Sequence, residues 1–154
     1  PRRGVYKRQD YTTLYVPDNV SETTYDNLMQ EPSVLHTLDI IKQSNITIHG
    51  IGDALKIARQ RHSTQDVLEK LQHHHAVGEA FGYYFDEQGH IVHKVKTIGL
   101  QLEDLESKAY IFAAAGGKSK GEAIKAYLTI APKNTVLITD ESAAKVITEV
   151  SNKK

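Results

Sequence analysis

The stretch that most constrains the fold is residues 109–128, AYIFAAAGGKSKGEAIKAYL. Its pattern predicts a buried strand over Tyr110–Ala115, then a turn that begins with two glycines, then a helix from about Gly121. Two adjacent glycines allow the backbone to turn sharply and let a ligand approach without a Cβ in the way. The chain therefore passes from strand to helix through a turn that is open to a ligand.

The turn over residues 116–120 has the composition of an anion site. The first N–H groups of the following helix have no partner within the helix and carry partial positive charge. Two lysines add full positive charge and a serine adds a hydroxyl donor, so we predict binding of a phosphate or another anion. An ordinary turn with lysines in water stays open as the alternative. The candidate residues are Gly116, Gly117, Lys118, Ser119 and Lys120.

Two motifs that suggest other ligands fail on their spacing. A P-loop needs a glycine at position 112, before Gly117-Lys118-Ser119, and this position is Phe112. Metal-binding histidines on one helix face are spaced i, i+4, whereas the histidines of residues 73–75 are adjacent and point in different directions. We therefore expect neither a P-loop nucleotide site nor a metal site.

Composition limits the class of function. The 154 residues carry 19 basic and 19 acidic side chains, so the formal net charge is zero. Because binding to a nucleic-acid backbone rests on surplus lysine and arginine, this balance argues against DNA binding by the chain alone. There is no cysteine for a disulfide, no apolar run long enough to span a membrane, and no signal peptide. We expect one cytoplasmic domain with no membrane partner.

The remaining segments predict an α/β fold. Predicted strands alternate with helices, and the segments Phe81–Phe85 and His90–Val95 flank a four-residue loop that predicts an antiparallel hairpin. We therefore predict a mainly parallel, Rossmann-like sheet flanked by helices, with an inserted β-hairpin. The predicted strands start at Tyr11, Ile46, Ala109 and Thr135, and the first of them reaches Val16. The predicted helices span residues 21–30, 33–43, 54–61, 63–73 and 103–107, and two more start near residues 121 and 140.

A second strand end resembles the first in its glycines. The strand at Ile46–Ile48 runs into the sequence HGIGD, which precedes a helix. Open α/β sheets bind their ligands beyond the carboxyl ends of strands. Gly50 and Gly52 are therefore candidate ligand-binding residues as well.

Four segments in order carry a family resemblance: GIGDA (50–54), GEAFGYYFDEQGHIVHKVKTIGLQLEDL (78–105), AAAGGKSKGEAI (113–124) and TVLITDESAAKVI (135–147). From about Tyr11 to Val150 the chain resembles the effector-binding domain of SorC-type bacterial transcriptional regulators, above all those that control glycolytic genes. The resemblance implies a sugar-phosphate sensor, related in fold to sugar-phosphate isomerases and deaminases but without their activity. It implies fructose-1,6-bisphosphate or a related phosphosugar as effector, no cofactor, and a homo-oligomer (dimer or tetramer).

The resemblance also implies roles for individual residues. Lys120 falls on the lysine that meets a phosphate, and Glu79 falls on the glutamate that reads sugar hydroxyls. A further ligand residue of the family is an arginine that follows the Gly-Ile-Gly helix. It falls on Arg59 or Arg61, because this chain reads Arg-Gln-Arg where relatives have adjacent arginines. The opening Pro-Arg-Arg-Gly resembles a strand-end Arg-Gly, which adds Arg3 as a phosphate ligand.

The chain departs from the family pattern at its N-terminal side. The family has a winged-helix DNA-binding domain, then a first strand and a Gly-Thr-rich phosphate loop, and none of these is present. A helix is also expected between Gly4 and Tyr11, but only residues 5–10 separate them, and a parallel crossover needs about a dozen residues or more. We expect residues 1–154 to be an effector-binding domain with a segment deleted or omitted, and operator DNA to be bound through the N-terminal domain.

A phosphosugar isomerase or deaminase is the alternative from another class. Such an enzyme needs a general base above the sugar carbon. The candidates near the predicted site are His49, Asp53 and Glu79, and none lies in a motif tied to catalysis. We therefore expect no catalytic residue and favour the sensor. On the plainest interpretation, Glu79 is a solvated loop carboxylate.

Overall fold

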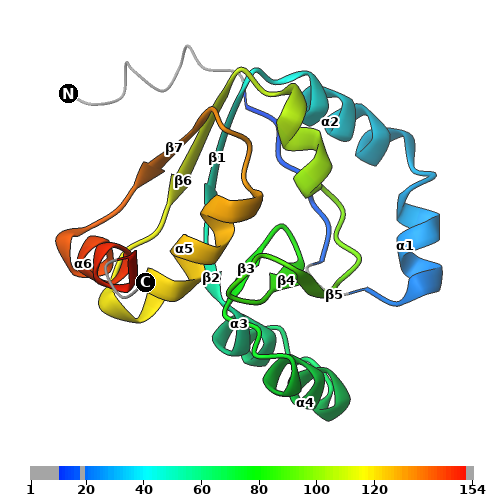
Figure 1. Ribbon diagram of the computed structural model, residues 1–154. Coiled ribbons are helices and arrows are strands. Elements are labelled where there is room, and N and C mark those ends of the chain that lie inside the picture. The colour runs from blue at the N-terminus through cyan, green and yellow to red at the C-terminus, as the bar shows by residue number, and fades with distance from the viewer. Residues whose placement is uncertain (1–10, 18–19, 152–154) are drawn as a thin grey trace, which may run out of the picture.

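The computed structural model describes residues 11–17 and 20–151 (Figure 1). Its central feature is a three-stranded parallel sheet in the order β1-β6-β7. In the register of this sheet, Ile48 lies beside Phe112 and Phe112 lies beside Val136. The predicted α/β fold class is confirmed. The three strands are β1 (Ile46–Gly50), β6 (Tyr110–Ala114) and β7 (Thr135–Ile138).

A four-stranded antiparallel sheet in the order β2-β3-β4-β5 lies beside the parallel one. The predicted hairpin is confirmed as the pair β4 and β5, but the sequence missed β3, which had been placed in a loop. A two-residue turn, Phe81-Gly82, joins β3 to β4, and both residues have positive φ (55° and 86°). The strands are β2 (Gly52–Asp53), β3 (Gly78–Ala80), β4 (Tyr83–Phe85) and β5 (Ile91–Lys94).

The helices begin and end within two residues of their predicted bounds wherever a bound was predicted. Capping residues mark where helices begin. The Ser21 hydroxyl, for example, accepts a hydrogen bond from the Thr24 N–H (3.2 Å) and so caps the first helix. The helices are α1 (Glu22–Leu28), α2 (Pro32–Gln43), α3 (Ala54–Gln60), α4 (Gln65–His73), α5 (Gly121–Ile130) and α6 (Glu141–Ser151), with 3-10 turns η2 (Leu102–Ser107) and η3 (Lys118–Lys120).

The strand predicted over Tyr11–Val16 is wrong. This segment runs without a strand partner in the described part of the chain, and Tyr11 and Tyr15 are 87% and 85% exposed. Aromatic and β-branched residues favour a strand only where neighbouring strands and a buried face give them something to pack against. Its composition favours a strand, but no strand of the described residues pairs with it.

The core lies between the parallel sheet, α5 and the antiparallel sheet. Ala113 on β6, Phe85 on β4 and Ile124 on α5 belong to one buried cluster, with α5 drawn across the front of the sheet in Figure 1. A second cluster, which includes Leu71 and Tyr84, joins α3 and α4 to the antiparallel sheet. The two clusters fix both sheets relative to the helices that follow β1 and β6.

The other face of the parallel sheet is apolar and uncovered. Five side chains that alternate with buried ones along the strands are 51–73% exposed: Ile46, Ile48, Tyr110, Val136 and Ile138. Parallel sheets are normally covered by helices on both faces.

Among the described residues, no helix is long and apolar enough to cross a membrane.

We expect Ile124→Ala to destabilise the fold strongly, because Ile124 is fully buried between α5 and the sheets. The loss in the free energy of unfolding should be about 2–5 kcal/mol, the usual cost of removing a large buried aliphatic side chain. Leu128→Ala on the same helix is the control, since Leu128 is 39% exposed and should cost less than about 1 kcal/mol. Urea unfolding of both variants measures the difference, and equal midpoints would contradict this account of the core.

Candidate functional site

Three strand ends meet at one edge of the parallel sheet. The last residues of β1, β6 and β7 lie side by side in register: Gly50 beside Ala114, and Ala114 beside Ile138. The segments that follow these strands, residues 51–53, 115–120 and 139–140, therefore converge. The sequence predicted the first two of these segments as ligand-binding and did not predict that residues 139–140 would lie beside them.

The turn over residues 116–120, which we call the glycine–lysine turn, forms a 3-10 turn before α5. Gly117 has φ +96°, and its carbonyl accepts a hydrogen bond from the Lys120 N–H (3.0 Å). The Lys120 ammonium is partly buried and donates to the carbonyl oxygen of Ile51 (2.8 Å). This bond ties the turn after β6 to the end of β1. Lys118 and Ser119 are exposed.

Asp140, which follows β7, already places an anion on this turn. Its Oδ2 accepts a hydrogen bond from the Gly117 N–H (2.6 Å), and its Oδ1 accepts one from the Ala143 N–H (2.9 Å) at the start of α6. A Cβ on Gly116 would lie 2.5 Å from Oδ2, so a larger residue here would displace the Asp140 carboxylate. The N–H of Ala143 and then the Ser142 hydroxyl lower the pKa of Asp140, which is therefore ionised at neutral pH.

Glu79 is a buried, paired carboxylate on β3, so its interpretation as a solvated loop residue is wrong. It is 6% exposed, and its Oε1 accepts hydrogen bonds from Arg61 Nη1 (3.1 Å) and from the Gly82 N–H (2.7 Å). Gly52 lies opposite Glu79 in the sheet register, and a Cβ on Gly52 would lie 3.3 Å from Oε2. The pairing of β2 with β3 thus brings Glu79 to the end of β1.

The two candidate arginines differ in position. Arg61 forms the ion pair with Glu79, whereas Arg59 lies on an exposed part of α3. Only Arg61 is held next to the other candidate residues. Arg3 lies outside the described residues, and its role as a phosphate ligand stays a prediction.

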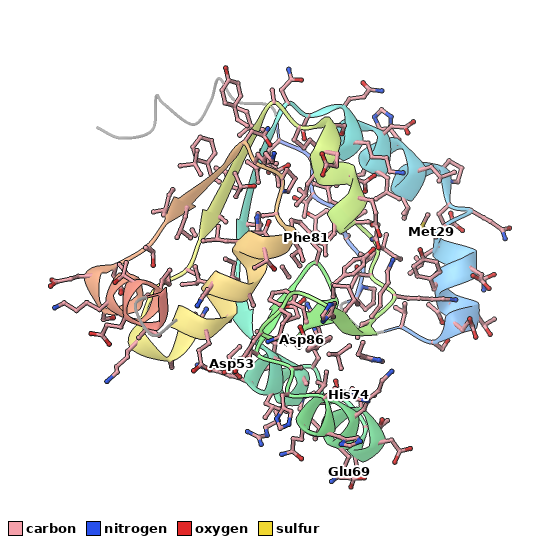
Figure 2. The ribbon with its side chains drawn as sticks, viewed as in Figure 1. Met29, Asp53, Glu69, His74, Phe81 and Asp86 are labelled. Carbon is pink, nitrogen blue, oxygen red and sulfur yellow. The ribbon has the colours of Figure 1, made fainter. Side chains whose placement is uncertain are left out.

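The three candidate bases of the enzyme alternative already have structural partners. His49 Nε2 lies 2.9 Å from the Tyr127 hydroxyl and its Nδ1 lies 3.0 Å from the Gly50 carbonyl oxygen. These contacts fit a neutral imidazole with its proton on Nδ1. Burial lowers the pKa of His49 and raises the pKa of Tyr127 to about 12, which keeps both groups neutral. Asp53 caps α3 through the Lys56 N–H (2.8 Å), at the position marked in Figure 2.

Phe81 closes over His49 from the β3–β4 turn. Its ring lies 4.6 Å from the His49 ring, centre to centre, and it is labelled in Figure 2. The φ of 55° is rare for so large a side chain, and such strain persists only where the surroundings impose it. Here the Gly82 N–H bond to Glu79 and the Val95 N–H bond to the Gly82 carbonyl (2.9 Å) hold the turn.

The described surface includes two hollows near segments that the sequence singled out. One, of about 420 Å³, lies between the glycine–lysine turn and α6 and is lined by Lys118, Asp140, Glu141, Ser142, Lys145, Val146 and Glu149. The other, of about 440 Å³, is lined by residues 73–75 and 86–88. The described residues contain no group of three or more His, Asp or Glu side chains that could hold a metal ion, those histidines included.

Together, the fold and this edge define a class: an α/β domain with a glycine–lysine turn where its parallel strands end. Residues 6–149 match the sequence model of the family described as "Putative sugar-binding domain". The chain belongs to this sugar-binding domain family, and its resemblance to SorC regulators is confirmed.

Relatives of this chain include transcriptional regulators. The chain is 50% identical over 135 residues to the central glycolytic genes regulator of Priestia megaterium and 47% identical over 135 residues to that of Bacillus subtilis, covering 88% of this chain and 39% of each relative. The crystal structure of a SorC family regulator from Enterococcus faecalis is 48% identical with a TM-score of 0.85, covering 90% of this chain and 56% of that one. The chain thus spans 39% of the length of the two glycolytic regulators.

We expect Arg61→Ala to destabilise the protein more than Arg59→Ala. Loss of Arg61 removes the charged donor of the buried Glu79 carboxylate and leaves the Gly82 N–H as the donor to Oε1, which should cost about 1–3 kcal/mol, less than for a fully buried pair because the Arg61 side chain is 26% exposed. Arg59→Ala, an exposed change of equal charge, should stay within about 0.5 kcal/mol. Chemical unfolding of the two variants compares them, and equal losses would mean that the ion pair contributes nothing.

Proposed function

We propose that this chain is the effector-sensing part of a transcriptional regulator of glycolytic genes, and that it binds fructose-1,6-bisphosphate or a related phosphosugar. The observation that carries the proposal is the glycine–lysine turn at the sheet edge, where the Gly117 N–H already holds a carboxylate oxygen. A backbone position that binds one anionic oxygen is suited to another, such as a phosphate oxygen. The similarity to glycolytic regulators supports the same class of ligand.

In this proposal each candidate residue has a defined task. Lys120, with Lys118, Ser119 and the glycines, binds one phosphate group. Glu79 reads sugar hydroxyls from the end of β1, where Gly50 and Gly52 let the ligand approach. Arg61 holds Glu79 in place and neutralises it. Arg59 and Arg3 stay in the proposal as further ligand-binding residues, Arg59 with the weaker support because it lies on an exposed part of α3.

The same proposal covers the partners. Effector binding shifts an equilibrium between states of a homo-oligomer, dimer or tetramer, that bind operator DNA differently. DNA is bound through an N-terminal winged-helix domain outside these 154 residues, in keeping with the zero net charge of the chain. We propose a cytoplasmic protein without cofactor, metal or catalytic activity. The contacts that already engage His49, Asp53 and Glu79 support a sensor over a phosphosugar enzyme.

We also propose that part of the effector-binding domain, including a first strand and a first phosphate loop, lies outside residues 1–154. The exposed apolar face of the parallel sheet supports this, because a parallel sheet is stable when helices cover both faces. The partial coverage of the relatives supports it as well.

Lys120→Ala in the intact protein tests the anion site. Loss of a charge-assisted hydrogen bond should weaken binding of fructose-1,6-bisphosphate by about 1.5–3 kcal/mol, roughly tenfold to a hundredfold. Lys125→Ala, on α5, removes the same charge outside the turn and should leave the affinity nearly unchanged. Calorimetry measures both, and an unaltered affinity for Lys120→Ala would remove this residue from the site.

The 154-residue chain alone should bind fructose-1,6-bisphosphate far more weakly than the longer protein. A bisphosphate needs donors at both charged ends, and each missing charged hydrogen bond costs about 1.5–3 kcal/mol. Thermal-shift titration compares the two proteins. Equal stabilisation by the ligand would show that the outside segment contributes nothing to the site.

A further inference from the structure

The carboxylate of Asp140 joins the glycine–lysine turn to the start of α6. Oδ2 is bound to the Gly117 N–H in the glycine–lysine turn, and Oδ1 is bound to the Ala143 N–H in the first turn of α6. The Ser142 hydroxyl also donates to Oδ1 (2.7 Å). One side chain therefore fixes the start of α6 to the turn that follows β6.

A phosphate bound at the same turn would compete with this carboxylate. The Gly117 N–H is a single donor, and it cannot make a good hydrogen bond to Asp140 and to a phosphate oxygen at once. A phosphate within hydrogen-bonding range of the turn would also lie a few ångströms from an ionised carboxylate, and like charges at that distance repel. The two anions are therefore alternatives at one position.

We propose that Asp140 is an internal anion that occupies the phosphate position when the effector is absent, and that the effector phosphate displaces it and so releases α6 from the glycine–lysine turn. This switch rests on the proposed function, because it requires a phosphate at residues 116–120. It adds to that function the residue through which binding is transmitted out of the site.

The surroundings allow such a movement and pass it on. The hollow of about 420 Å³ between Lys118 and α6 is lined by Asp140 itself, so the side chain has room to turn away from Gly117. α6 packs directly on the start of α5: a Cβ on Gly121 would lie 2.5 Å from the Val146 Cβ. A shift of the first turn of α6 must therefore change its packing against α5, and Figure 1 shows these two helices side by side.

Asp140→Asn and Glu141→Gln separate the switch from a simple change of net charge. Each removes one negative charge at the start of α6, but Glu141 pairs with Lys145 (2.6 Å) instead of the turn. Asparagine still caps a helix, so α6 should stay folded in Asp140→Asn. We expect Asp140→Asn to tighten binding of inorganic phosphate and of fructose-1,6-bisphosphate about threefold to tenfold in the intact protein, and Glu141→Gln to change it much less.

Amide hydrogen exchange of the unaltered protein gives a second measure that needs no variant. Adding fructose-1,6-bisphosphate should lower the protection of the Ala143 N–H, because its carboxylate partner moves away, while the Gly117 N–H stays protected by the phosphate. In Asp140→Asn the ligand should change the protection of Ala143 much less.

The outcomes distinguish the switch from the site on which it rests. Binding with unchanged protection at Ala143, equal effects of the two variants, or weaker binding by Asp140→Asn would each overturn the switch and leave the sugar-phosphate site standing. The last result would mean that Asp140 supports the turn for the ligand instead of competing with it. No binding of either phosphate by the unaltered protein would overturn the proposed function itself, and the switch with it.

Discussion

Hydrogen bonding of β1, β6 and β7 in one parallel register places three strand ends, at Gly50, Ala114 and Ile138, next to one another. Everything at the candidate site depends on this alignment. A shift of two residues in one strand would move its end by about 6–7 Å, which no hydrogen bond spans. The Lys120 bond to the Ile51 carbonyl and the Asp140 bond to the Gly117 N–H both cross between neighbouring strand ends, so they exist only in this register.

The antiparallel sheet places a buried charged residue, Glu79, beside that edge. Glu79 is almost fully covered, and a buried carboxylate is costly unless donors surround it. Arg61 and the Gly82 N–H supply those donors, and Gly52 leaves room for the second oxygen. The strained Phe81-Gly82 turn is the consequence, because the Gly82 N–H must point back at Glu79. The carboxylate that we propose as a reader of sugar hydroxyls is thus also one half of a structural ion pair.

Local patterns in the sequence predicted the elements well, and they failed where a partner decides the outcome. The helices were found to within two residues because caps, glycines and apolar spacing act within one or two turns of chain. The segment Tyr11–Val16 has the composition of a strand, but it pairs with no strand of the described residues. The segment Gly78–Ala80 was placed in a loop, since three small or charged residues carry no strand pattern, but pairing with β2 and β4 makes it a strand.

The sequence by itself determined the α/β order, the family, and a glycine–lysine turn between a strand and a helix. Each strand, turn and helix signal comes from residues close together in the chain, and the family follows from four such segments in order. Only the tertiary structure decided that Arg61 and not Arg59 meets Glu79, and that Asp140 reaches Gly117, 18 and 23 residues away respectively. The sequence shows Asp140 as an acid suited to a helix start, which is half of its role. The other half depends on which strand ends lie side by side, and that is fixed by sheet order and packing across the whole domain.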